Sequence, residues 1–331
     1  ANIYLLALII PLVSVLGVLL GDVMLRRRAR QMEALGHDPV NIDKLLFAPN
    51  TETKPNWWIL GGSLVFAFFT VSMGVSDIPL AQEIIFIGSM SIILFLMYRL
   101  LLELDKKARN MLVGTAIIIF VFRAVPSPGP GIGWFEIDDL GFDQQFLSVL
   151  SLIGATLTLV GLFVLRPMMA KRSIAFVIVL LTIMAGILSL PNIGLYYGIQ
   201  DWTLIHTNGV VDARFIAIVD TALESPLGQI AMIPMLAWIA QNAPAHLKAT
   251  FFAVMASFTN LALSASSLGT RYLNDIYTIT REVKDRVTQV IESTADYGEL
   301  GWLLISVTVI GFIAPLVTVY LIQHSPLRTH Q

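Results

Sequence analysis

The chain has 331 residues, of which 56% are hydrophobic and only 13% are charged, and its formal net charge is −2. Soluble domains carry about 25% charged residues, so this composition excludes a soluble enzyme, a nucleic-acid-binding protein and a disordered scaffold. It predicts a polytopic membrane protein. Without cysteine and with five scattered histidines, the sequence offers no disulfide framework, thiol nucleophile or metal-ligand spacing. We therefore expect no metal and no cofactor.

Apolar segments long enough to cross a membrane recur along the chain. A helix needs roughly 20 apolar residues to cross a hydrocarbon core of about 30 Å. The pattern is weaker for 111–127, which is short, and for 213–240, which contains Asp220 and Glu224. We expect an all-α, multi-pass protein of the plasma or inner membrane, with nine helices over residues 2–21, 57–76, 80–102, 111–127, 145–165, 173–194, 213–240, 247–271 and 300–323.

Lysine and arginine are concentrated in alternate loops of this predicted topology. Most of the 21 basic residues lie on one face, chiefly in the loops 22–56, 99–110 and 166–172. The positive-inside rule makes that face cytoplasmic, so the chain begins outside. The mixed-charge loop after residue 271 is expected to form an amphipathic or surface helix. An outward start, an odd number of helices and an initial alanine lead us to expect that upstream helices are missing.

The first unusual motif lies at the end of the segment 111–127. Arg123 ends an apolar run and is followed by Pro126, Pro128 and Gly129. Proline breaks a helix and frees backbone groups, and a cation beside a broken helix can hold an anion. The alternative is that Arg123 extends to the membrane interface and the prolines merely end the helix.

The second unusual motif lies within the segment 213–240. Asp220 and Glu224 are four residues apart, so they share one helix face, and Pro226 interrupts that helix. An ionisable residue inside the membrane is costly and usually faces a cavity or a partner. Carboxylates on a broken helix are typical of a transport site. The alternative is a structural pair in which Arg214 or Arg123 satisfies Asp220.

An aspartate cluster, formed by Asp138, Asp139 and Asp143, raises an enzyme alternative. Membrane prenyltransferases bind magnesium diphosphate through aspartate-rich motifs. Such a site needs two clusters that face each other, and the only second candidate is Asp220 with Glu224. The sequence contains no nucleophile and base pair, phosphate-binding loop or HExxH motif, so we expect that the protein is not an enzyme.

Three motifs follow one another between residues 111 and 323. They are the run 123–129 with Trp134, the run 220–234, and the run 249–261. In this order and spacing they resemble the seventh, tenth and eleventh helices of the folate–biopterin transporter family, which belongs to the major facilitator superfamily. The residues expected to shape these motifs are Pro126, Pro128, Gly129, Gly141, Gly228 and Pro234.

The resemblance implies a major facilitator-like fold of twelve helices in two six-helix bundles. On that map, residues 111–325 form the second bundle and 105–110 a short basic link. Residues 1–104 then carry three helices of the first bundle. The nine helices of this chain would be helices four to twelve. The outward start predicted from the basic residues agrees with this, because a fourth helix begins outside.

The resemblance also implies a function, namely transport of folate or a related pterin by alternating access, coupled to protons, by a monomer in the lipid bilayer. Arg123 would pair with a substrate carboxylate. Asp220 would hold the pterin or, with Glu224, carry the proton. Alternatives are another organic anion or a tetrapyrrole-like substrate, the enzyme above, or a scaffold that transports nothing. The remaining expected binding residues are Gln229, Trp134 and Asn260.

Overall fold

The computed structural model describes residues 9–36, 38, 42, 46, 57–76, 78–227, 248–284 and 291–328. The chain divides into two compact units, Ala1–Asn56 and Trp57–Gln331.

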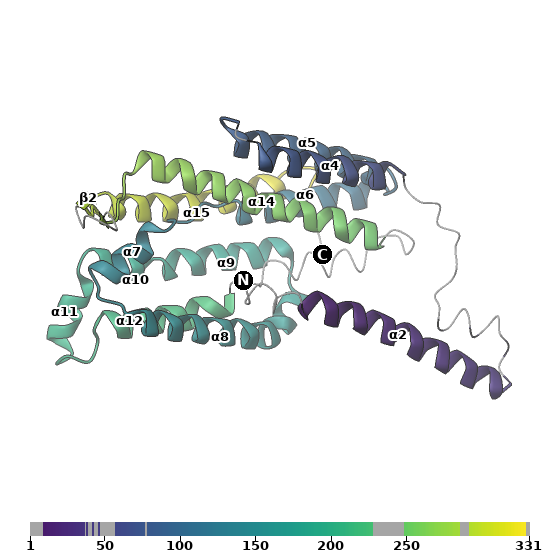
Figure 1. Ribbon diagram of the computed structural model, residues 1–331, viewed down its shortest axis with the longest axis horizontal. Coiled ribbons are helices and arrows are strands. Elements are labelled where there is room, and N and C mark those ends of the chain that lie inside the picture. Colours follow the sequence, from purple (N-terminus) through teal and green to yellow (C-terminus); the bar gives the residue numbers. More distant parts are fainter. Residues whose placement is uncertain are drawn as a thin grey trace. The chain divides into compact units, whose positions relative to one another are not determined.

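Helix α2, Ile9–Ala34, lies in the first unit (Figure 1). It extends well beyond the predicted end at residue 21 and includes the basic run that was expected to lie in a loop. Arginine, glutamine, methionine and glutamate are good helix formers, so the helix continues through them. An ion pair one turn apart, between Arg26 Nε and Asp22 Oδ2 at 2.8 Å, lies on its surface.

The second unit is built almost entirely from helices. Its departure from the all-α expectation is an antiparallel pair of short strands, β1 and β2, where the sequence predicted a surface helix. This region is rich in threonine, valine and isoleucine, which favour strands over helices. The elements are α4 (Trp57–Val75), α5 (Ala81–Leu101), α6 (Lys106–Arg123), α7 (Gly131–Asp138), α8 (Gln144–Lys171), α9 (Ile174–Leu188), α10 (Leu190–Tyr196), α11 (Ile199–His206), α12 (Ala213–Glu224), the 3-10 turn η1 (Ser225–Leu227), α14 (Lys248–Ile276), β1 (Val283–Lys284), β2 (Ile291–Ser293) and α15 (Leu300–Gln323).

Within the described residues, six helical segments are long and apolar enough to cross a membrane. This confirms six of the nine expected spans and supports an integral, multi-pass membrane protein. Helix α6 matches a seventh expected span, but four of its 18 residues are basic. Of the expected span 213–240, the structure describes residues 213–227. The six segments are Trp57–Val75, Ala81–Leu101, Gln144–Val164, Ile174–Tyr196, Thr250–Ile276 and Leu300–Gln323.

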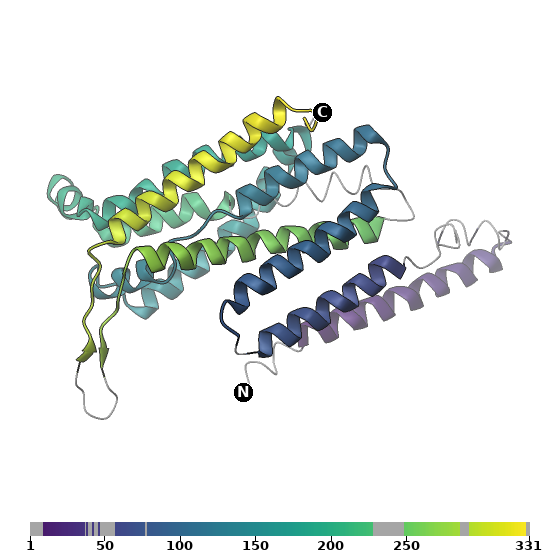
Figure 2. The same cartoon turned by 90° about the horizontal axis from the view of Figure 1, so that it is seen from above.

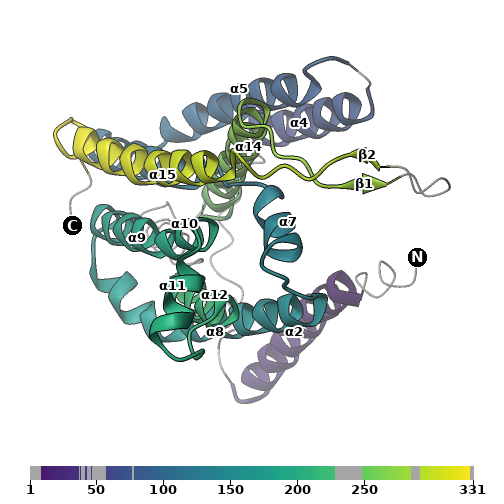
Figure 3. The same cartoon turned by 90° about the vertical axis from the view of Figure 1, so that its left-hand side faces the viewer.

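Helix α6 lies at the centre of the second unit and packs against α9, α14 and α15. Figures 2 and 3 show α14 between α5 and α6, and α8 beside α12 on the other side of α9. Side chains of five helices, α5, α6, α9, α14 and α15, form one buried apolar cluster, in which Ile118 and Met255 have no exposed surface. Because α6 packs against these helices, the break at its end lies beside α9, α14 and α15, with residues 124–129 half-buried except for the exposed Ser127.

Close approach of two backbones positions the end of α12. A Cβ atom added at Gly161 of α8 would lie 2.6 Å from both Cα and O of Pro226 in η1. Real side-chain atoms do not approach backbone atoms so closely, and overpacking of this kind costs about 1–3 kcal/mol. Glycine at 161 therefore allows η1, and with it the carboxylates of α12, to lie against α8.

Gly161→Ala should lower the thermal unfolding temperature of the detergent-solubilised protein, because α8 and η1 must separate by a few tenths of an ångström or more. Gly133→Ala is the matched control, since a Cβ atom at Gly133 meets nothing within 4 Å. Equal unfolding temperatures for the two variants would contradict the close packing at Gly161.

Candidate functional site

The first helix break of the site follows Arg123, the last residue of α6. Pro126 and Pro128 prevent the helix from continuing, and the freed backbone groups bond to side chains of α14. Ser266 Oγ donates to Val125 O at 2.6 Å, and Thr270 Oγ1 accepts from Ser127 N at 2.9 Å. Non-helical backbone at membrane depth requires such partners. The predicted break is therefore confirmed, and α14 holds it in place.

The same face of α14 also fixes Gly129, one of the predicted motif residues. Asn274, one turn beyond Thr270, donates from Nδ2 to Pro128 O at 3.3 Å. Gly129 has φ of +76°, a conformation that favours glycine, and a Cβ atom there would lie 2.9 Å from Asn274 Nδ2. Ser266, Thr270 and Asn274 are spaced by four residues, so they lie on one face of α14. From this face they hydrogen-bond to the backbone of the segment after α6.

A second break lies between α9 and α10, inside the predicted span 173–194. Ser189 ends α9, and Pro191 lies in the first turn of α10. The Ser189 hydroxyl donates to Gly186 O at 2.9 Å. In the first turn of α10, Asn192 directs its amide toward α12, where Nδ2 donates to Asp220 Oδ2 at 3.1 Å.

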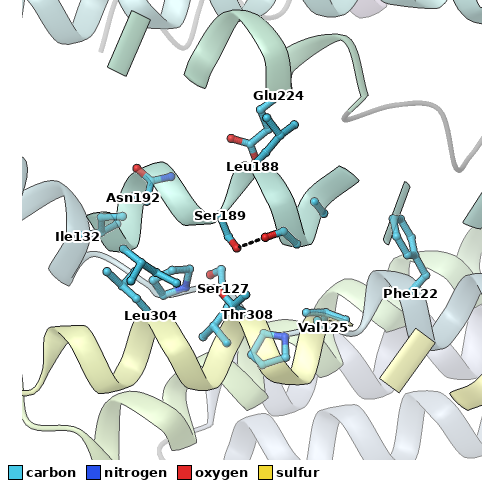
Figure 4. Close-up of a pocket in the computed structure, with 17 residues that line it drawn as sticks. Phe122, Val125, Ser127, Ile132, Leu188, Ser189, Asn192, Glu224, Leu304 and Thr308 are labelled. Carbon is cyan, nitrogen blue, oxygen red and sulfur yellow. Dashed lines mark hydrogen bonds between the residues drawn. The ribbon is translucent and has the colours of Figure 1, made fainter. Parts of the chain in front are cut away.

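A cavity of about 300 Å³ lies where these two breaks meet. Ser127 and Asn192 come from the broken segments, Glu224 from the end of α12, and Thr308 from α15. Figure 4 shows Glu224 and Thr308 on helices at opposite sides of this cavity. Most of the other lining residues are apolar, so a few polar groups converge in an apolar pocket, as in small-molecule sites.

Asp220 is buried beside this cavity, with 7% of its surface exposed. Its Oδ2 atom accepts from Asn192, while Oδ1 is buried and has no hydrogen-bond partner among the described residues. Neither of the two arginines considered as structural partners of Asp220 forms an ion pair with it. Arg214 pairs instead with Asp143, at 2.9 Å, and Arg123 forms no ion pair within the described part of the chain. The Oδ1 atom of Asp220 can therefore accept a hydrogen bond from a ligand or carry a proton.

Arg123 is half-buried at the end of α6. Its Nε atom is buried and has no hydrogen-bond partner in the part of the chain that the structure describes. The neighbours Phe122 and Val125 line the cavity, whereas Arg123 itself is not among the lining residues. Arg123 is thus next to cavity-lining residues in the sequence, but its side chain is not part of the cavity wall. A buried donor without a partner is costly, and an anion is one group that can satisfy this Nε atom.

Asp220 and Glu224 lie one turn apart on α12, as the spacing predicts. Glu224 lines the cavity, and Asp220 reaches it through Asn192. The end of α12 is fixed by two hydroxyl groups: Ser225 Oγ donates to Thr221 O, and Thr158 Oγ1 donates to Ser225 O at 2.8 Å. One carboxylate, that of Glu224, thus lines the cavity, and that of Asp220 lies behind Asn192.

The structure does not bring all of the predicted binding residues to this cavity. Trp134, on α7, packs against an apolar cluster around Phe135 and Leu304; Leu304 lines the cavity, whereas Trp134 does not. Asn260 is exposed on α14 and is not among the lining residues. Gly141 lies between α7 and α8, with φ of +66°. Three further predicted residues, Gln229, Gly228 and Pro234, lie outside the described residues.

Asn192, Ser189 and Thr308 were not predicted for the site. Asn192 directly follows Pro191 in a long apolar run, and this dipeptide was the available signal. A polar amide after a proline inside an apolar segment indicates that the helix is interrupted there.

The predicted aspartate cluster is engaged in structural contacts. Arg281 donates to both carboxylate oxygens of Asp138, at 3.1 and 3.3 Å, and the Tyr297 hydroxyl donates to Oδ2. Asp143 begins α8 by accepting from Phe146 N at 2.8 Å. Among the described residues, no group of three histidine or acidic side chains is arranged to hold a metal ion. The cluster ties α7 to the segment that carries the two strands.

These contacts make the connection between α7 and the segment with the two strands insensitive to pH near neutrality. Hydrogen bonds from Arg281 and then from Tyr297 lower the pKa of Asp138 below its ordinary value of 3.8. The contribution of the carboxylate to stability is therefore complete above that value and is lost as the pH falls through the lowered pKa. Burial and the hydrogen bond to Asp138 raise the pKa of Tyr297 to about 12. Its contribution is complete below the ordinary value of 10 and is lost as the pH rises through about 12.

Asp138→Asn should weaken the connection between α7 and the segment with the two strands, because the Arg281 guanidinium loses its charged partner. Amide hydrogen exchange at Thr280 and Asp296, which bond to each other at 2.9 and 3.1 Å, should become faster. Asp139→Asn is the matched control for a neighbouring exposed carboxylate. In the unmodified protein the protection factors should stay constant between about pH 5 and 9. Protection that decays within this window would contradict the assignment.

Comparison with known proteins identifies the family. The profile of the BT1 family matches residues 5–330. The chain belongs to the BT1 family. This assignment confirms the family expected from the three motifs. No solved structure matches the chain.

A curated relative is the folate-biopterin transporter of Synechocystis sp., which is 26% identical over 148 residues. The match covers 44% of this chain and 28% of that protein, so this chain is compared with less than a third of the relative's length. That relative is named as a transporter, and the family match together with the six apolar helices indicates that this chain is an integral, multi-pass membrane protein.

Proposed function

We propose that this BT1-family chain moves folate or a related pterin across the membrane by alternating access, coupled to protons. The observation that carries the proposal is that two buried polar atoms, Arg123 Nε and Asp220 Oδ1, have no hydrogen-bond partner among the described residues. Arg123 ends α6 at the first helix break, and Asp220 accepts a hydrogen bond from Asn192, which lies at the second break and lines the cavity. Discontinuous helices with ionisable residues at their ends are the usual setting of substrate and ion sites in secondary transporters.

In this proposal the two charges have different tasks. Arg123 pairs with a substrate carboxylate, since its planar guanidinium matches that group. Asp220 carries the coupling proton, and Glu224, which faces the cavity, takes part in that exchange. Asn192 orients Asp220 through the hydrogen bond at 3.1 Å. The proposed contacts of Gln229, Trp134 and Asn260 with the pterin ring rest on the family resemblance alone.

The cavity size favours a substrate with a compact ring. About 300 Å³ is at the lower end of the volumes that hold small molecules, which suits a pterin ring more readily than a tetrapyrrole. The lining combines apolar walls with hydroxyl and amide groups from Ser127, Ser189, Asn192 and Thr308. Such groups hydrogen-bond a flat heterocycle while the walls enclose its faces.

The proposal also includes the architecture of the family. Residues 1–104 would belong to one bundle and residues 111–325 to the other, joined by 105–110, in a monomer with nine helices that correspond to four to twelve of a major facilitator-like fold. The packing of α6 against α9, α14 and α15 supports the second bundle. Contact between α5 and α14 would then be a contact between bundles.

Equilibrium binding to the purified protein tests the substrate class. Labelled folate should bind saturably in detergent, and unlabelled biopterin should displace it, because both present the pterin ring. If folate does not bind and pterins displace nothing, while a tetrapyrrole or an unrelated organic anion binds, the substrate assignment is wrong and the alternative substrate class takes its place.

A further inference from the structure

A second cavity lies at the opposite end of α6 from the site described above. Its volume is about 350 Å³, and Lys106 and Lys107, from the first turn of α6, line it together with Arg328. The other lining residues are Asn110, Met111 and Pro326. Residues more than 200 positions apart in the sequence thus bring three cationic side chains to one hollow.

The turn after α15 is held in place against α6, so this grouping is built into the fold. Asn110 Nδ2 donates to Pro326 O at 3.3 Å. Within the turn, Leu327 N and Arg328 N donate to Ser325 Oγ and Ser325 O, at 3.1 and 3.2 Å. A Cβ atom at Gly114 would lie 2.0 Å from Leu327 O, so glycine is needed for this approach.

The three cations have no acidic partner within the described residues. None of the described ion pairs includes Lys106, Lys107 or Arg328. The nearest acid in the sequence, Asp105, is used to cap α6, where its side chain accepts from Ala108 N at 3.0 Å. The cavity therefore gathers positive charge and leaves it available to an anion.

The chemistry of the anion follows from the position of the cavity. Helix α6 begins here with charged residues and becomes apolar from Met111 onward, and α15 ends here at Gln323. Such a change from charged to apolar residues is typical of the boundary between the hydrocarbon core and the headgroups. Basic pockets between membrane helices at this depth bind phosphate-bearing lipid headgroups. The positive-inside rule would account for basic residues on this face of the membrane. It does not explain why the turn after α15 is fixed so that Arg328 lies beside the two lysines.

We propose that the cavity lined by Lys106, Lys107 and Arg328 binds an anionic phosphate group, supplied by a lipid headgroup at the membrane surface or by free phosphate. The test is native mass spectrometry of the protein in detergent, titrated in separate arms with phosphatidylglycerol, phosphatidylcholine and inorganic phosphate. The matched variants are K106Q/K107Q/R328Q, Arg328→Gln alone, and Arg172→Gln. The last of these lies outside the cavity, with its guanidinium over the Phe176 ring at 5.2 Å.

Phosphatidylglycerol should bind the unmodified protein and Arg172→Gln equally, and phosphatidylcholine more weakly. The triple variant should bind phosphatidylglycerol roughly 100-fold more weakly, because each basic residue near a membrane surface contributes a factor of about five. Arg328→Gln alone should show a partial loss. Equivalent losses in the inorganic phosphate arm, without selectivity for the anionic lipid, would support the site with free phosphate as its ligand. Binding that is absent in both arms, or unchanged in the triple variant, would overturn the proposal.

Discussion

Asp220→Asn is expected to reduce uptake driven by a pH gradient to background, while exchange of labelled for unlabelled folate across the same membrane continues. Asparagine resembles the protonated, neutral carboxyl group, so the site should still bind substrate and change its access. It cannot release a proton, so the gradient can no longer drive accumulation. Both rates are measured in vesicles that carry equal amounts of the variant and the unmodified protein.

The matched control for this variant is Asp212→Asn, on the same helix. Asp212 begins α12 by accepting from Phe215 N at 2.8 Å, and asparagine caps a helix equally well. This variant should keep both gradient-driven uptake and exchange. The role assigned to Asp220 would be wrong if Asp220→Asn kept gradient-driven uptake at the unmodified rate, or if a well-folded Asp220→Asn lost exchange together with uptake.

Arg123→Ala is expected to raise the KM for folate roughly 10- to 100-fold. A charge-assisted hydrogen bond contributes about 1.5–3 kcal/mol, and about 1.4 kcal/mol corresponds to a tenfold change in affinity. The KM of Arg123→Lys should lie between those of the unmodified protein and Arg123→Ala, because lysine keeps the charge but not the planar guanidinium group. Initial rates of uptake over a range of folate concentrations give these values.

The substrate itself provides the control for Arg123. Biopterin has the pterin ring but no carboxylate, so its KM should change little in Arg123→Ala. An equal loss for folate and biopterin would show that Arg123 shapes the cavity without binding the carboxylate. An unchanged KM for both substrates would remove Arg123 from the site.

The membrane helices could be predicted from the sequence because they depend on one property, the length of an apolar run. The same property misplaced the end of α2, where good helix formers extend the helix beyond its apolar part. It also concealed the break at Ser189. Pro191 lies in the first turn of α10, where proline is tolerated, so the apolar pattern continues across two separate helices. The strands after α14 could not be inferred from charge, because β-branched residues determined the local structure.

The candidate site could be predicted only in part, and for a similar reason. Arg123 and Asp220 were identifiable because an ionisable residue in an apolar segment is costly wherever it lies. Asn192 and the α14 stripe of Ser266, Thr270 and Asn274 carry no charge, and such residues are common in helix packing. Their roles depend on contacts across 28 and about 140 residues of sequence, which no local pattern contains.

The aspartates at 138 and 143 belong to the cluster that raised the enzyme alternative, which the sequence did not favour. In the structure each has a separate partner, Arg281 and Arg214 respectively. Acidic residues close together in the sequence bind a metal only if their side chains converge, and these two diverge because one ends α7 and the other begins α8.

The most direct test of the account is the initial rate of labelled folate entry into vesicles that contain the protein, with an imposed inward pH gradient and with the gradient collapsed by a protonophore. Coupling through a buried carboxylate predicts entry that is fast with the gradient, falls when the gradient is collapsed, and is competed by unlabelled biopterin. Entry at the same rate with and without the gradient would contradict proton coupling. No entry above that of protein-free vesicles, with the protein shown to be folded, would contradict folate transport itself.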